Sequence, residues 1–129
     1  MTDDKYKIYI CYAISLTEFK EFEAAEKMYK TAIEFDPNSA NAIVLLANLY
    51  SSSDRIAEAV DLYKKALRVQ PNNPETYMLL GNAHYLNNDV EQAILSYRAS
   101  IGLAPDNDEY RLIYSQVVDD YVKSVRGEI

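Results

Sequence analysis

Three side-chain amides recur at a fixed interval along the chain, at Asn48, Asn82 and Gln116. A side-chain amide both donates and accepts hydrogen bonds. A row of such amides can therefore bind the backbone of an extended or helical peptide without selecting its sequence. The same amides can instead cap turns or bond to neighbouring helices. The spacing leaves both interpretations open, and the choice depends on the elements that carry these residues.

The more reactive side chains form no catalytic or metal-binding pattern. His84 is the only histidine, so we interpret it as a buried histidine within a helix rather than as a ligand or a base. Cys11 is the only cysteine and has apolar neighbours, which predicts a small hydrophobe and excludes an intrachain disulfide. The sequence has no glycine-rich phosphate loop, no paired catalytic carboxylates and no nucleophile–base constellation. We therefore expect a non-enzymatic protein with no cofactor and no metal.

The charge balance and the N-terminal residues narrow the class of protein further. The chain has 129 residues and a net charge of −7, from 13 Lys and Arg against 20 Asp and Glu. Phosphate binding needs clustered basic residues, so this balance argues against a nucleic-acid partner. The single cysteine suits a reducing compartment. The apolar stretch from Tyr6 to Leu16 lacks a basic leader and is too short to span a bilayer. We expect a cytoplasmic protein that is not membrane-embedded.

A 34-residue period organises the whole chain. Pro37, Pro71 and Pro105 mark it, and the same offset relates Ala25, Ala59 and Ala93 as well as Tyr29, Tyr63 and Tyr97. Apolar residues between the prolines follow a helical spacing. We predict one domain over 1–129, with repeats over about 6–39, 40–73 and 74–107. The expected helices cover 5–18, 22–35, 40–52, 55–69, 74–86, 89–103 and, as a solvating cap, about 108–126.

These recurring residues resemble those of the tetratricopeptide repeat family. The second repeat carries most of the family's pattern, which here is Leu46, Ala47, Tyr50, Ala59, Tyr63, Ala66 and Pro71. The third repeat departs from it, with His84 where Tyr is usual and Ser100 where Ala is usual. The resemblance implies an all-α fold, a right-handed superhelix (α-solenoid) of three helix-turn-helix repeats plus a C-terminal capping helix. Small residues such as Ala47 and Ala59 would let paired helices approach closely.

The resemblance also implies a binding face, because the first helix of each repeat lines a concave groove in related proteins. The expected groove residues are Ile10, Ile14, Asn41, Val44, Leu45, Asn48, Met78, Leu79, Asn82, Tyr85, Leu112 and Gln116, with Cys11 on the same face. One subtype binds acidic C-termini through Lys, Asn and Arg, but those sites here are Ile10, Ile14, Leu45, Glu75 and Leu79. We therefore reject that role and expect an apolar ligand.

The expected function is a protein–protein interaction module or adaptor. It would bind an apolar peptide or helical segment of a partner protein in the groove, with a chaperone or assembly role as one use. The alternative is a self-associating scaffold whose groove is filled by its own chain or by another copy. A separate anomaly is the first helix, which is apolar on nearly every side from Tyr6 to Leu16. We expect either a homodimer through this N-terminal helix or a partner that covers it.

Overall fold

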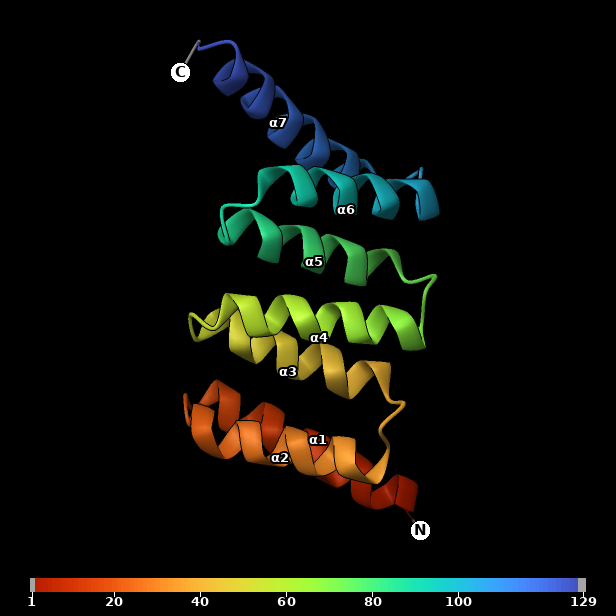
Figure 1. The fold of residues 1–129 in the computed structure, drawn as a ribbon. Coiled ribbons are helices and arrows are strands. Elements are labelled where there is room, and N and C mark those ends of the chain that lie inside the picture. The colour runs from red at the N-terminus through yellow and green to blue at the C-terminus, as the bar shows by residue number, and fades with distance from the viewer. Residues whose placement is uncertain (1, 128–129) are drawn as a thin grey trace. The chain divides into compact units, whose positions relative to one another are not determined.

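The computed structural model describes residues 2–127, with side chains from Tyr6 onward. All regular structure within these residues is α-helical (Figure 1). The helices are α1 (Thr2–Glu18), α2 (Phe22–Phe35), α3 (Ala40–Ser52), α4 (Ile56–Val69), α5 (Pro74–Leu86), α6 (Val90–Leu103) and α7 (Asp108–Val125). The predicted boundaries are confirmed to within one residue, except that α1 begins three residues earlier than expected. None of the described helices is both long and apolar enough to cross a bilayer.

The chain divides into two compact units, Met1–Pro71 and Asn72–Ile129. In the first unit α1 pairs with α2 and α3 pairs with α4, while α2 also contacts α3. In the second unit α5 pairs with α6, and α7 packs on α6. Each pair is the helical hairpin that the sequence period predicts, and the all-α helical-repeat class is confirmed.

Side-chain caps fix the starts of α3, α5 and α7. Ser39, Asn73 and Asn107 precede α3, α5 and α7, and each accepts a hydrogen bond from the backbone N–H three residues on. These caps satisfy N–H groups that have no partner inside the helix. Asp89 caps α6 in the same way, through the N–H of Gln92. Four of the described helices therefore begin at a residue whose side chain caps them.

The turn inside each hairpin uses a left-handed residue. Lys20, Asp54 and Asn88 have φ values of 63°, 65° and 64°, and they occupy equivalent positions in the three repeats. Asn and Asp tolerate this conformation because their short side chains can bond locally, whereas a lysine gains nothing from it. The first turn is therefore the most strained of the three.

Small residues let the paired helices approach closely, as predicted. Ala13 and Ala25 are fully buried between α1 and α2, and Ala47 and Ala59 are fully buried between α3 and α4. In the second unit the approach is closer still. A Cβ added to Gly81 would lie 2.5 Å from a ring carbon of Tyr97, so only glycine fits there. Tyr97 packs with Met78 and Ala93 in a core that four α7 side chains cover: Tyr110, Ile113, Tyr114 and Val117.

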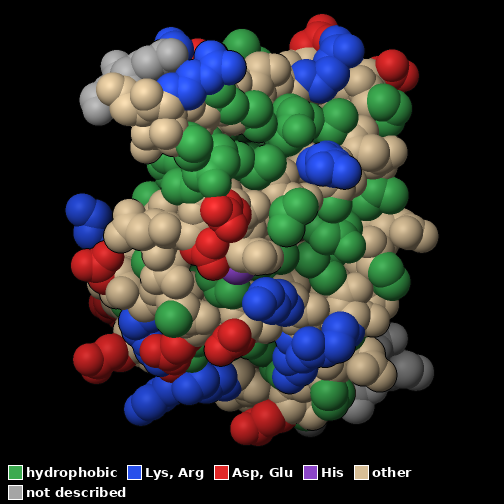
Figure 2. Space-filling model, turned by 45° about the horizontal axis from the view of Figure 1, so that its top comes forward, with side chains coloured by type: hydrophobic (Ala, Val, Ile, Leu, Met, Phe, Trp, Pro, Cys, Tyr) green, Lys and Arg blue, Asp and Glu red, His purple; other side chains and the backbone are tan. Residues whose placement is uncertain are grey.

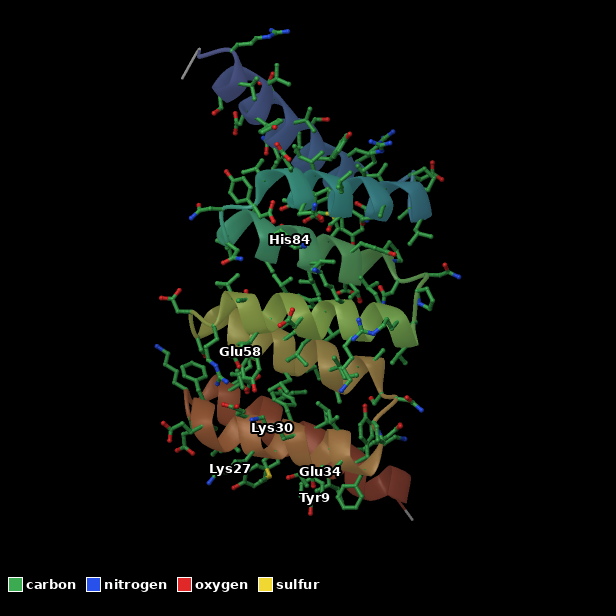
Figure 3. All side chains as sticks on the ribbon, in the orientation of Figure 1. Tyr9, Lys27, Lys30, Glu34, Glu58 and His84 are labelled. Carbon is green, nitrogen blue, oxygen red and sulfur yellow. The ribbon has the colours of Figure 1, made fainter. Side chains whose placement is uncertain are left out.

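A polar cluster joins the first two repeats within the first unit. The Glu26 carboxylate of α2 accepts a hydrogen bond from the Tyr50 hydroxyl of α3 at 2.7 Å. Lys30 and Arg55 each place a nitrogen 2.8 Å from the same carboxylate. The Arg55 guanidinium also lies 3.9 Å from the centre of the Tyr50 ring, a cation–π geometry. Lys30 and Glu58, which also pairs with Arg55, are labelled in Figure 3.

This cluster holds Glu26 in its charged form. Burial alone would raise the pKa of Glu26, but the hydrogen bonds from Lys30, Tyr50 and Arg55 outweigh it and lower that pKa to about 2. The same arrangement raises the pKa of the Tyr50 hydroxyl, through burial and the neighbouring carboxylate. Both groups therefore keep the protonation state that the hydrogen bond needs across the physiological range.

Candidate functional site

Two of the three recurring amides are held by tyrosines of the paired helix. The Tyr97 hydroxyl donates to Oδ1 of Asn82 at 2.6 Å, and the Tyr63 hydroxyl donates to Oδ1 of Asn48. The interpretation in which the amides bond neighbouring helices is therefore confirmed for these two oxygens. Each bond also fixes its amide, because the oxygen faces the tyrosine and Nδ2 is left on the other side as a donor.

The tyrosines remain donors over the whole physiological range. Burial raises the pKa of Tyr63 to about 12 and that of Tyr97 to about 12. Both rings are almost fully buried, at 2% exposure each, while Asn82 is exposed and Asn48 is half-buried. In each pair a buried tyrosine thus holds an asparagine amide that reaches the surface.

A hollow of about 280 Å³ in the first unit brings three of the expected groove residues together. Ile14 comes from α1, while Leu45 and Asn48 come from α3. The other lining residues are Thr17, Glu18, Tyr29, Leu49 and Ser52. Apolar Ile14 and Leu45 next to a positioned amide form a site that can hold an apolar side chain and one backbone group of a peptide.

The first repeat lacks the amide of the other two. Ile14 occupies the position that corresponds to Asn48, and the tyrosine at the corresponding place, Tyr29, interacts with Thr17 instead. Burial raises the pKa of Tyr29, and the hydrogen bond with Thr17 offsets part of that rise. The first repeat therefore keeps the buried tyrosine, Tyr29, but the apolar Ile14 replaces the amide.

The remaining expected residues separate into surface and core. Val44 and Leu79 are half-buried, and Asn41 and Tyr85 are exposed. On α7, Leu112 is 59% exposed and Gln116 is also exposed. By contrast Ile10 and Met78 are only 7% and 4% exposed. Met78 packs in the core of the second unit, so neither it nor Ile10 presents a side chain to a ligand.

The two reactive side chains differ from each other in exposure. His84 of α5 is buried, as expected for a histidine at a packed position (Figure 3). Cys11 is exposed, beside Ile8 and Tyr12 and one helical turn from Ile14. Its place on the inner face stays a prediction. Among the described residues, no three His, Cys, Asp or Glu side chains gather closely enough to hold a metal ion.

Sequence models of the tetratricopeptide repeat match two overlapping segments of the chain, residues 44–108 and residues 16–62. The first match alone spans half of the 129 residues. The chain belongs to the tetratricopeptide repeat family. No curated protein sequence matches it.

Solved tetratricopeptide repeat domains share the fold at low sequence identity. The first such domain of Spaghetti (RPAP3), bound to the HSP90 peptide SRMEEVD, is 17% identical with a TM-score of 0.84, over 92% of this chain and 94% of that one. The Sgt2 domain from Aspergillus fumigatus is 19% identical with a TM-score of 0.87, over 96% and 83%. The Arabidopsis OM64 domain is 16% identical with a TM-score of 0.80, over 91% and 97%.

Proposed function

We propose that this tetratricopeptide repeat protein is an adaptor that binds a weakly charged, apolar peptide segment of a partner protein. The observation that carries the proposal is the tyrosine-held amide, which occurs twice, at Asn48 and at Asn82. Because each amide oxygen is already bonded to a tyrosine, the free Nδ2 group can donate to a peptide carbonyl. In the first unit, apolar side chains of the ligand would lie near Ile14 and Leu45.

Acidic side chains in each of the two units favour an apolar rather than an acidic ligand. The Spaghetti domain is bound to the peptide SRMEEVD, which carries three acidic residues and a single Arg. In the present chain Glu18 lines the hollow in the first unit, and Glu75 is exposed on α5. A carboxylate of the ligand would be repelled by these groups, whereas an apolar side chain would be buried against Ile14 and Leu45. An assembly or chaperone role is one use of such a site.

The test is to remove the amide donor while keeping the acceptor for the tyrosine. Alanine at Asn48 would also leave the buried Tyr63 hydroxyl without its partner, which costs stability. The double variant Asn48→Asp with Asn82→Asp keeps both Oδ1 acceptors and deletes both Nδ2 donors. The matched control is Asn38→Asp with Asn72→Asp, which adds the same charge at two exposed turn positions that are equivalent in the first and second repeats.

Binding is measured with peptides selected on the wild-type protein from a displayed random library. We expect the selected peptides to be rich in apolar residues and poor in Asp and Glu, and SRMEEVD not to bind. The Asn48→Asp, Asn82→Asp variant should bind at least tenfold more weakly, about 1.4 kcal/mol, while the turn variant binds normally. If no peptide is enriched, or if both double variants bind like the wild type, the proposal fails.

A further inference from the structure

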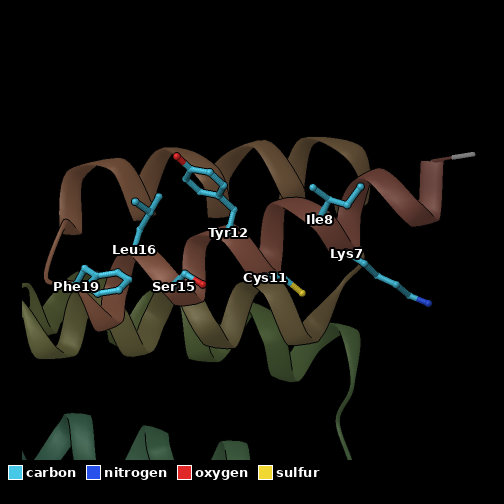
Figure 4. A pocket seen from close by; sticks show the side chains of 7 residues that line it. All are labelled: Lys7, Ile8, Cys11, Tyr12, Ser15, Leu16 and Phe19. Atoms are coloured by element: carbon cyan, nitrogen blue, oxygen red, sulfur yellow. The ribbon is translucent and has the colours of Figure 1, made fainter.

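The first helix carries a second apolar surface that neither the core nor the candidate peptide site uses. We define it as the α1 stripe, which comprises Ile8, Cys11, Tyr12, Ser15, Leu16 and Phe19. Together with Lys7 these residues line a hollow of about 550 Å³ (Figure 4). Figure 4 shows Ile8, Tyr12 and Leu16 along one side of the helix, while Lys7 points away near its N-terminal end.

The α1 stripe lies opposite the buried side of α1. Ile8, Tyr12 and Phe19 are 65%, 57% and 78% exposed, whereas Ile10 and Ala13 on the other side are buried. Isolated exposed apolar residues are normal on a protein surface, but a contiguous patch marks a docking site. The surface drawn in Figure 2, by comparison, mixes hydrophobic side chains with Lys, Arg, Asp and Glu.

The order of large and small residues in the α1 stripe is self-complementary. When two copies of the helix run antiparallel about the midpoint between residues 13 and 14, positions whose numbers sum to 27 face each other. Ile8 then faces Phe19, and Ser15 lies beside Tyr12 and Cys11 of the other copy. The small side chain of Ser15 thus meets the large ring of Tyr12, which is how helix surfaces interlock without voids. We propose that the α1 stripe binds the α1 stripe of a second copy of this chain in an antiparallel, twofold-symmetric dimer.

Charge along the helix favours the same orientation. Lys7 lies at one end of the α1 stripe, and Glu18, Glu21 and Glu23 gather around its other end with Lys20 among them. An antiparallel arrangement brings Lys7 of one copy toward the acidic end of the other, whereas a parallel one would bring the acidic ends together. The chain has a net charge of −7, so two copies associate best through a surface with few acids.

The size of the α1 stripe fits a reversible dimer. Ile8, Tyr12 and Phe19 together expose on the order of 400 Å², since a full side chain of their kind offers about 150–250 Å². A standard interface buries about 800 Å² per partner. Neighbouring groups can supply the remaining area. They are the half-buried Leu16 and the exposed Cys11 of α1, the exposed Phe22 of α2, and the aliphatic parts of Lys7 and Lys20. No residue of the α1 stripe lines the hollow that contains Ile14, so the dimer does not rest on the proposed peptide site.

Cys11 provides a test in the unmodified chain, because it is the only cysteine and is exposed on the α1 stripe. We expect sedimentation to show a monomer at low and a dimer at high protein concentration, with the Cys11 alkylation rate at least tenfold lower in the dimer. Phe19→Lys should remain monomeric and react quickly throughout. Leu95→Lys, at a site on α6 that is 52% exposed, should behave like the wild type. A monomer at every concentration overturns the proposal, and so does a dimer in which Cys11 is not protected.

A disulfide assay tests the antiparallel direction. The two Cys11 residues would be offset by five positions, about 7.5 Å along the helix axis, and would also be separated by the distance between the helices. That exceeds the reach of a disulfide. Ser15→Cys would place a thiol beside Cys11 of the other copy, on the same edge of the interface, so mild oxidation should give covalent dimers of Ser15→Cys but not of the wild type. Rapid oxidation of the wild type to covalent dimers would overturn the antiparallel assignment.

Discussion

Removing the charge of Glu26 should destabilise the first unit in a way that depends on pH. Glu26→Gln keeps an oxygen that can accept from Tyr50 but loses the ionic interactions with Lys30 and Arg55. The folded-state pKa of Glu26 is about 2, against an ordinary value of 4.5. At about 1.36 kcal/mol per pKa unit, this difference sets an upper limit near ~3.4 kcal/mol. Lys30 and Arg55 are 56% and 38% exposed, so solvent screening reduces the expected effect to about 1–2 kcal/mol.

The direction of this pH dependence follows from the lowered pKa of Glu26. Stability from the charged form of Glu26 is fully present above pH 4.5, the ordinary pKa, and is lost as the pH falls toward the folded-state pKa of about 2. Urea unfolding of wild type and Glu26→Gln, followed by helical circular dichroism, should therefore show a large difference near neutral pH and less than half of it near pH ~3. Glu58→Gln, which removes a more exposed partner of Arg55, serves as the control and should show a smaller effect. An equal difference between wild type and Glu26→Gln at both pH values would refute the reasoning.

Two further predictions concern the backbone of the hairpins, and urea unfolding tests both. Gly81→Ala should lower the free energy of unfolding by about 1–3 kcal/mol, because the added methyl group would displace the Tyr97 ring. Gly102→Ala, in open space on α6, is the matched control, and it should raise the free energy of unfolding by up to about 1 kcal/mol. Equal effects at the two glycines would contradict the packing argument. Lys20→Asn should gain about 0.5–1 kcal/mol, since φ is 63° there. A loss of stability in Lys20→Asn would contradict the assignment of strain to that turn.

The helices were predictable from sequence because their signals are local. Apolar spacing and capping residues such as Asn73 and Asp89 lie within a few residues of the helix ends that they define. The Glu26 cluster was not predictable in this way, because Tyr50 and Arg55 are 24 and 29 residues away in the chain. No local pattern indicates that a charged residue on one repeat will meet a tyrosine on the next.

The candidate site was predictable only in part, because some residues were assigned to the wrong side of a helix and one signal was not used. On a helix that is apolar on several sides, a shift of one position turns a side chain by about 100°, so Ile10 and Met78 were assigned to the groove although they are buried. The amide–tyrosine bonds had a signal that could have been used. Tyr63 and Tyr97 each follow their asparagine by 15 residues, and this offset occurs twice.

The caps and the left-handed turns have a consequence for how chains of this kind can change length. Ser39, Asn73 and Asn107 mark equivalent boundaries, as do Lys20, Asp54 and Asn88. Duplicating or deleting one whole repeat keeps every boundary in phase with the helices that it starts or joins. Any other length of insertion within a helix would rotate the following apolar face by about 100° per residue. Growth by whole-segment duplication is therefore the change in length that this architecture tolerates best.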